Sequence, residues 1–136
     1  MSENAEIVRR SYQSWNSGDL DGFVEFLDPD VEIDLSERVF NPGSYQGTEG
    51  FRRWAEELAE VWEQWTMEPE QIIESGEQVL VAVRARGLGR GSGVKIDRLG
   101  YNVVTVRDGK AVRIAFFYDR EKALQAAGVP ESELAG

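Results

Sequence analysis

Acid–base chemistry in this chain can rest only on carboxylates, tyrosines and lysines, because its 136 residues contain no histidine and no cysteine. The lack of cysteine excludes thiol catalysis, thiolate zinc sites and disulfide scaffolds. The lack of histidine removes the commonest metal ligand and the usual general base near neutral pH. A carboxylate in an apolar pocket could take over the role of base, because burial raises its pKa.

Asp34 is the first candidate for such a base. It belongs to the segment Val31–Leu35, whose alternating apolar and polar residues predict a strand. The same alternation would place Val31, Ile33 and Leu35 in the core and turn Asp34 toward water. The sequence leaves both orientations open.

A second set of residues could line an apolar cavity. Trp15 and Trp54 lie at helical spacing within apolar stripes, and strand alternation puts Ile114, Phe116 and Tyr118 on one face of a predicted strand. Together they would form a pocket for a flat hydrophobic ligand. The alternative interpretation is that all five are ordinary core residues.

The element expected to organise these residues is a long β-hairpin. Strands are predicted over Lys95–Val106 and Ala111–Tyr118, and the Asp108-Gly109 pair between them is typical of a tight turn. The glycine-rich segment 87–93 lacks the Lys-Ser/Thr pair of a phosphate-binding loop, and no helix follows it. We therefore predict a hairpin loop or bulge at 87–93.

Helices and shorter strands precede this hairpin. Apolar spacing and capping residues predict the helices Glu3–Trp15, Asp19–Leu27, Thr48–Glu63 and Arg120–Ala127. Further strands are predicted near Thr66–Glu74 and Gln78–Gly87, and Ser36–Gly47 is expected to be one long loop. The tail Glu131–Gly136 is expected to be mobile.

This order of elements predicts the α+β class and a single domain over residues 1–136. A cone-shaped, curved antiparallel (mixed) sheet would wrap around three N-terminal and central helices, with a short helix at the C-terminus. A conical cavity would then lie between the concave face of the sheet and the helices.

The charge balance narrows the range of partners. A net charge of −10 opposes nucleic-acid binding, which needs clustered lysines and arginines. The glutamates of the third helix (Glu56, Glu57, Glu60 and Glu63) indicate a solvated face, so neither a metal site nor a cofactor is predicted. No signal sequence or long apolar run is seen, which predicts a cytoplasmic protein without membrane association.

Several motifs resemble, in their order along the chain, the SnoaL-like branch of the nuclear transport factor 2-like superfamily. They are NSGDLDG at 16–22, DPDVE at 28–32, YQG at 45–47, RDGK at 107–110 and YDREKAL at 118–124. This superfamily also contains ketosteroid isomerases, polyketide cyclases and limonene epoxide hydrolases. The resemblance spans nearly the whole chain and is more specific for the fold than for an activity.

The resemblance implies roles for three residues. Asp34 lies where ketosteroid isomerases keep their general base, and Asn102 lies near the position of an acid that donates a hydrogen bond to the oxyanion. Those isomerases also have an oxyanion tyrosine on the first helix, but our register places it opposite Ser11, one residue before Tyr12. Asn102 could equally be a cross-strand polar residue, and Tyr12 a half-buried core aromatic.

Three functions follow from the resemblance. The first is an isomerase or cyclase that transfers a proton next to a carbonyl of a small hydrophobic substrate. The second is a non-catalytic ligand-binding or dimerisation module, with a homodimer formed through the sheet face at Val104, Val106, Arg113, Ala115 and Phe117. The third is an epoxide hydrolase, for which Arg84, Arg86, Asp97 and Arg98 supply the residue types, although Phe116 occupies the expected place of a second aspartate.

Overall fold

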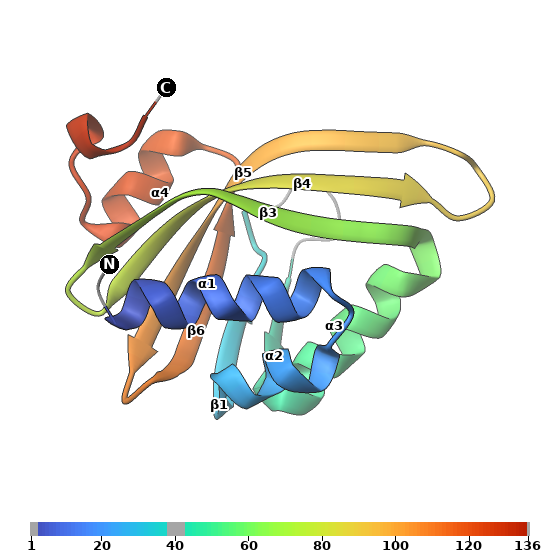
Figure 1. The fold of residues 1–136 in the computed structure, drawn as a ribbon, viewed down its shortest axis with the longest axis horizontal. Coiled ribbons are helices and arrows are strands. Elements are labelled where there is room, and N and C mark those ends of the chain that lie inside the picture. Colours follow the sequence, from blue (N-terminus) through green and yellow to red (C-terminus); the bar gives the residue numbers. More distant parts are fainter. Residues whose placement is uncertain (1–2, 38–42, 136) are drawn as a thin grey trace.

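A six-stranded mixed sheet curls around the helices α1, α2 and α3 in the computed structural model, which describes residues 3–37 and 43–135 (Figure 1). The helices are α1 (Glu3–Asn16), α2 (Leu20–Phe26), α3 (Gly47–Val61), α4 (Arg120–Ala127) and the short 3-10 helix η1 (Glu131–Glu133). The strands are β1 (Leu27–Asp34), β2 (Ser44–Gln46), β3 (Trp62–Ser75), β4 (Gln78–Gly89), β5 (Lys95–Arg107) and β6 (Lys110–Phe117).

The sheet has the strand order β2-β1-β6-β5-β4-β3. Strand β1 pairs with β6 in parallel, and every other neighbouring pair is antiparallel. The predicted α+β class with a mixed sheet is therefore confirmed. Among the described helices, none is long and apolar enough to cross a membrane.

The predicted hairpin is present as β5 and β6. Asp108 and Gly109 both adopt positive φ angles, 51° and 76°, which is the backbone of a type I′ turn. Asparagine, aspartate and glycine tolerate this conformation best, so the Asp-Gly pair determines where the hairpin turns. The hairpin connection predicted at 87–93 lies further along, because residues 87–89 still belong to β4 and the turn covers residues 90–94 before β5 starts at Lys95.

Predicted capping residues fix three helix ends. The side chain of Asp19 accepts a hydrogen bond from the Gly22 amide, and that of Asp119 accepts one from the Lys122 amide. Gly128 ends α4 with φ +69°. The helix predicted to start with Thr48 as its capping residue begins instead at Gly47, and its N-cap is Gln46.

The long loop predicted at 36–47 contains a strand. Residues 44–46 form β2, in which Tyr45 pairs with Ile33 of β1. Three residues are too few for a period-two pattern to be recognised, and their pairing depends on β1, which lies earlier in the chain. Residues 38–42 of the predicted loop lie outside the described residues.

The C-terminal tail is fastened, contrary to the prediction of mobility. Arg120 donates to the carbonyl oxygens of Leu134 and Ala135, and Gln71 of β3 binds the carbonyl of Glu133 and the amide of Ala135. Leu134 is buried against the sheet. Gly136 lies outside the described residues.

Apolar side chains form a core on each face of the sheet. The larger core lies between the concave face and helices α1, α2 and α3, and it includes Val104 and Val106. The smaller core lies under α4, and Phe117 packs against it. Val104 and Phe117 thus point to opposite faces, so the residues expected to form one dimerisation surface are divided between the two faces.

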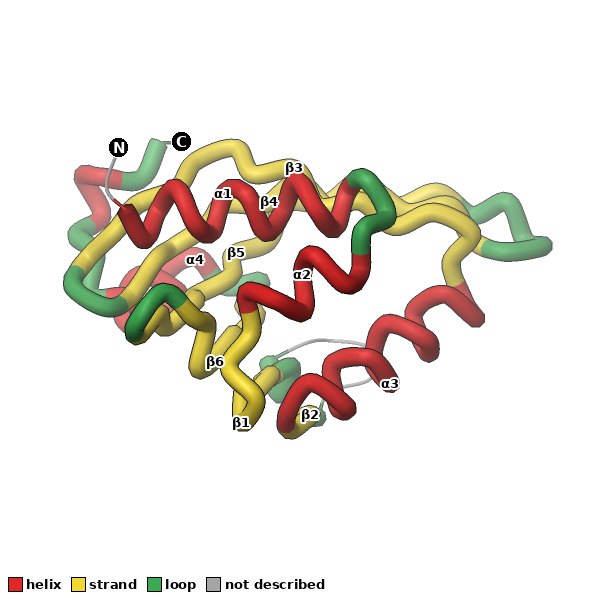
Figure 2. Tube along the Cα trace, turned by 60° about the horizontal axis from the view of Figure 1, so that its bottom comes forward, coloured by secondary structure: helices red, strands yellow, loops and turns green. Residues whose placement is uncertain are grey.

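Helix α1 is attached to the edge strand β3 by a side-chain clamp. Asn16 Nδ2 donates to the Met67 carbonyl (2.7 Å), and the Met67 amide donates to Asn16 Oδ1 (2.8 Å). The preceding residue, Trp15, donates from Nε1 to the Trp65 carbonyl (3.1 Å). Figure 2 shows α1 running along β3, with α2 and α3 below α1 in that view. The clamp holds the helix against the curled edge of the sheet.

We expect Asn16→Ala to lower the free energy of unfolding by about 2–3 kcal/mol, because it leaves both half-buried backbone groups of Met67 without a partner. Urea titration followed by far-UV circular dichroism measures the change. Gln13→Ala, at an exposed position of the same helix, is the matched control. Equal stability of the two variants would contradict the assigned role of the clamp.

Candidate functional site

Tyr12 and Asn102 meet inside the larger core. Asn102 Nδ2 donates to Tyr12 Oη at 2.5 Å, although 90 residues separate the two in sequence. Tyr12 is 4% exposed and Asn102 is 5% exposed. Ser11 is the residue that the resemblance placed opposite the oxyanion tyrosine of the isomerases. Its hydroxyl donates instead to the Val8 carbonyl of the same helix. The structure therefore brings together two of the three residues predicted to be catalytic.

Burial determines the protonation state of Tyr12. Removal from water raises the pKa of its hydroxyl above the ordinary value, and the hydrogen bond from Asn102 only partly opposes this. Tyr12 is therefore a neutral hydrogen-bond donor near neutral pH. Within residues 3–37 and 43–135, its own O–H proton has no hydrogen-bond acceptor in the structure.

Asp34 lies on the other face of the sheet. In β1 the residues Val31 and Ile33 enter the helix-side core, whereas Asp34 alternates to the opposite face. There Arg113 of β6 donates to Asp34 Oδ2 at 2.5 Å, and the Ser36 amide donates to Oδ1 at 2.9 Å. The structure does not bring Asp34 to the Tyr12–Asn102 pair.

These contacts also set the charge of Asp34. Hydrogen bonding from Ser36 is the largest influence and lowers the pKa of the carboxyl group. Partial burial acts in the opposite direction, and the positive charge of Arg113 adds to the lowering. Asp34 is consequently an ion-paired carboxylate at neutral pH. Its assigned role as a general base stays a prediction.

The residues predicted to bind a ligand gather on the concave side. Trp15, Trp54, Ile114 and Phe116 all pack against the helix-side core. Tyr118 meets Phe116 edge to face, with ring centroids 4.8 Å apart, and Arg98 lies over the Tyr118 ring at 3.8 Å. The buried indole N–H of Trp54 has no hydrogen-bond partner among the described residues.

Two cavities flank the clamp between α1 and β3. We call the first the α1 groove; it has a volume of about 410 Å³ and is lined by Arg9, Tyr12, Gln13, Asn16 and residues 68–72. We call the second the tryptophan cleft; it has a volume of about 330 Å³ and lies among the α1–α2 turn, α3 and the start of β3. Its lining residues are Trp15, Gly18, Leu20, Ala55, Glu56, Leu58, Ala59, Trp62, Glu63 and Trp65.

The sequence analysis missed the two tryptophans at the start of β3. Trp62 falls within the helix predicted over Thr48–Glu63, but α3 ends at Val61 and Trp62 is the first residue of β3. Trp65 directly precedes the predicted strand and lies opposite Gly87 in β4. Pairing of a large aromatic residue with a glycine on the neighbouring strand is the signal that could have located this cleft.

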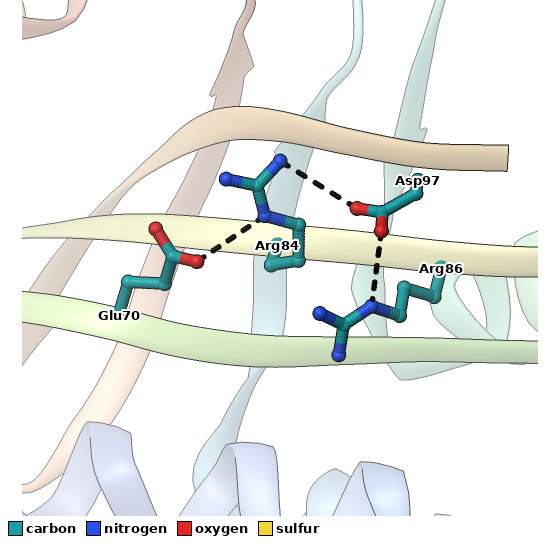
Figure 3. Close-up of polar contacts among 4 residues, drawn as sticks. All are labelled: Glu70, Arg84, Arg86 and Asp97. Atoms are coloured by element: carbon teal, nitrogen blue, oxygen red, sulfur yellow. Dashed lines mark hydrogen bonds and ion pairs between the residues drawn. The ribbon is translucent and has the colours of Figure 1, made fainter.

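The residue types required for epoxide hydrolysis form a network on the outer face. Arg84 contacts Glu70 (3.2 Å) and Asp97 (3.5 Å), and Asp97 also contacts Arg86 (3.4 Å) (Figure 3). Asp97 and Arg86 are more than half exposed. The network faces solvent, away from the helix-side core, and therefore does not form an enclosed hydrolytic site.

Comparison with known proteins establishes the family. A model of the SnoaL-like domain matches residues 8–114, and the protein belongs to this family. The curated proteins give no match. Many solved structures match the fold.

TerC, crystallised with polyporic acid, is 25% identical and superposes with a TM-score of 0.78, covering 93% of this chain and 98% of TerC. A nuclear transport factor 2-like protein of unknown function from Burkholderia pseudomallei is 23% identical, with a TM-score of 0.78 and coverage of 93% and 98%. A candidate polyketide cyclase from Xanthomonas campestris is 20% identical, with a TM-score of 0.72 and coverage of 88% and 93%.

The lowered pKa of Asp34 makes the stability of the fold sensitive to acid. The folded state favours the carboxylate, so this stabilisation is present above the unfolded pKa of about 4 and is lost as pH falls through the folded value. We expect the melting temperature to fall less steeply below pH 4 in Asp34→Asn than in the wild type. Asp30→Asn, at an exposed position of the same strand, is the control, and identical slopes for all three proteins would contradict the assignment.

Proposed function

We propose that this protein binds a small, largely apolar molecule that carries a carbonyl or hydroxyl oxygen, and that Tyr12 holds this oxygen. The observation that carries the proposal is the Tyr12–Asn102 hydrogen bond within an otherwise apolar core. Asn102 donates a hydrogen bond to the Tyr12 oxygen and leaves the hydroxyl proton free to donate. A buried polar group of this kind is costly unless a partner satisfies it.

The surroundings support a ligand of this class. Tyr12 forms part of the wall of the α1 groove, whose volume of about 410 Å³ suits a small molecule. Behind Tyr12, the core is rich in rings, including Trp15 and Phe116. A relative with 25% identity, TerC, was crystallised with polyporic acid. A flat, oxygenated ligand is consistent with these features.

An isomerase or cyclase reaction is the catalytic form of this proposal. Tyr12, held by Asn102, would donate to the oxygen on which negative charge develops while a proton leaves the neighbouring carbon. Such a reaction needs a base as well, and Asp34 is the candidate from the sequence. The ion pair of Asp34 with Arg113 on the opposite face favours the non-catalytic alternative, a ligand-binding module.

We expect the wild-type protein to bind polyporic acid and Tyr12→Phe to bind it about tenfold more weakly, because the variant retains the ring but loses the donor. Isothermal titration calorimetry measures both affinities. Tyr101→Phe, which removes a hydroxyl from the smaller core on the other face of the sheet, should bind like the wild type, as should Asp34→Asn. Equal affinity of Tyr12→Phe and wild type, or no binding by the wild type, would count against the proposal.

The homodimer predicted through the sheet face is a further part of the proposal. Beyond α4, the outer face carries the charged side chains of Arg84, Arg86 and Asp97, so pairing there would depend on ion pairs. We expect a dimer at low ionic strength that weakens as salt is added. Size-exclusion chromatography with light scattering tests this, and a monomer at every salt concentration would contradict it.

A further inference from the structure

We propose that the tryptophan cleft is a second ligand site and that it takes the alkylammonium group of a small cationic molecule. This site is separate from the one proposed for Tyr12. The Asn16–Met67 clamp lies between the two cavities, and their linings share no residue: Asn16 lines the α1 groove and its neighbour Trp15 lines the tryptophan cleft. The two sites can therefore be tested independently.

Three indole rings provide most of the aromatic surface of the cleft. Trp62 and Trp65 have ring centroids 5.3 Å apart and planes inclined at 45°, so the two rings are not stacked face to face. Trp15 joins them from the end of α1. The faces of tryptophan rings carry negative electrostatic potential and attract cations more strongly than other aromatic rings do.

The rings are held in place before any ligand arrives. A Cβ atom at Gly87 would lie 2.7 Å from Trp65 Cε3 and 3.1 Å from Trp62 Cε3, so both rings rest directly against bare backbone of β4. Trp15 is fixed by its hydrogen bond to the Trp65 carbonyl. A site whose aromatic groups are already positioned loses little entropy on binding.

The charged residues of the cleft favour a ligand of positive charge. The charged residues that line the cleft are Glu56 and Glu63, and neither Lys nor Arg is among its lining residues. Arg90, in the connection between β4 and β5, is held at α3, where its Nε donates to the Ala59 carbonyl. Two carboxylates beside three indoles favour a cation and repel an anion. An alkylammonium group also presents methyl groups to Leu20 and Leu58.

Choline and its uncharged isostere 3,3-dimethylbutan-1-ol test this inference, since they differ only in whether a nitrogen or a carbon carries the three methyl groups. We expect choline to quench or shift tryptophan fluorescence and to bind about tenfold more tightly than the isostere. Chemical-shift changes of the indole N–H groups in NMR spectra should identify Trp62 and Trp65 as the contacts. Equal affinity for the two compounds, or binding by neither, would overturn the proposal.

Substitution of the carboxylates separates the contribution of charge from that of shape. We expect the double variant Glu56→Gln/Glu63→Gln to bind choline about three- to tenfold more weakly and the isostere as before. Glu60→Gln, which lies on α3 with Glu56 but not in the lining, is the control, and Tyr12→Phe should also leave choline binding unchanged. Unchanged choline affinity in the double variant would overturn the role given to charge.

Discussion

The clamp between Asn16 and Met67 is the contact on which the arrangement of helices and sheet depends. A strongly curled sheet has a concave face that must be covered, and α1 covers it only if the end of the helix is held at the rim. The side-chain amide of Asn16 pairs with both the backbone amide and the backbone carbonyl of Met67 in the edge strand. These two hydrogen bonds fix the end of α1 relative to β3. The α1 groove and the tryptophan cleft lie on either side of this fixed point.

The two faces of the sheet have different chemistry because strand residues alternate. On the helix side, Asn102 is a polar residue among apolar neighbours and has a single tyrosine as its partner. On the other side, Asp34 and Arg113 neutralise each other at the boundary with solvent. The neutral donor therefore lies inside the fold, and the ion pair lies outside it. An enzyme of the isomerase kind needs its carboxylate on the inner face.

The predictable parts of the structure were those fixed by neighbouring residues. The Asp108-Gly109 turn and the caps at Asp19, Asp119 and Gly128 follow from backbone preferences that act over a few positions. The fold itself followed from the resemblance of ordered motifs. The orientation of Asp34 did not follow, because alternation is compatible with either face until the partner strand is known.

The site was only partly predictable, for the same reason. Tyr12 and Asn102 were named separately, but their contact depends on the curvature of a sheet across 90 residues. The cleft was missed because Trp62 changes from helix to strand at a boundary that sequence patterns locate poorly. Each of these features depends on how distant segments pack together.

The clamp also has a consequence for association between chains. Strand β3 is one edge of the sheet, and its free backbone groups at Trp65 and Met67 are already occupied by side chains of α1. Pro69 lacks an amide proton, and a bulge next to it breaks the regular spacing. At the opposite edge, β2 has only three residues. The described sheet thus offers little template for strand addition, which protects a β-rich chain from aggregating edge to edge.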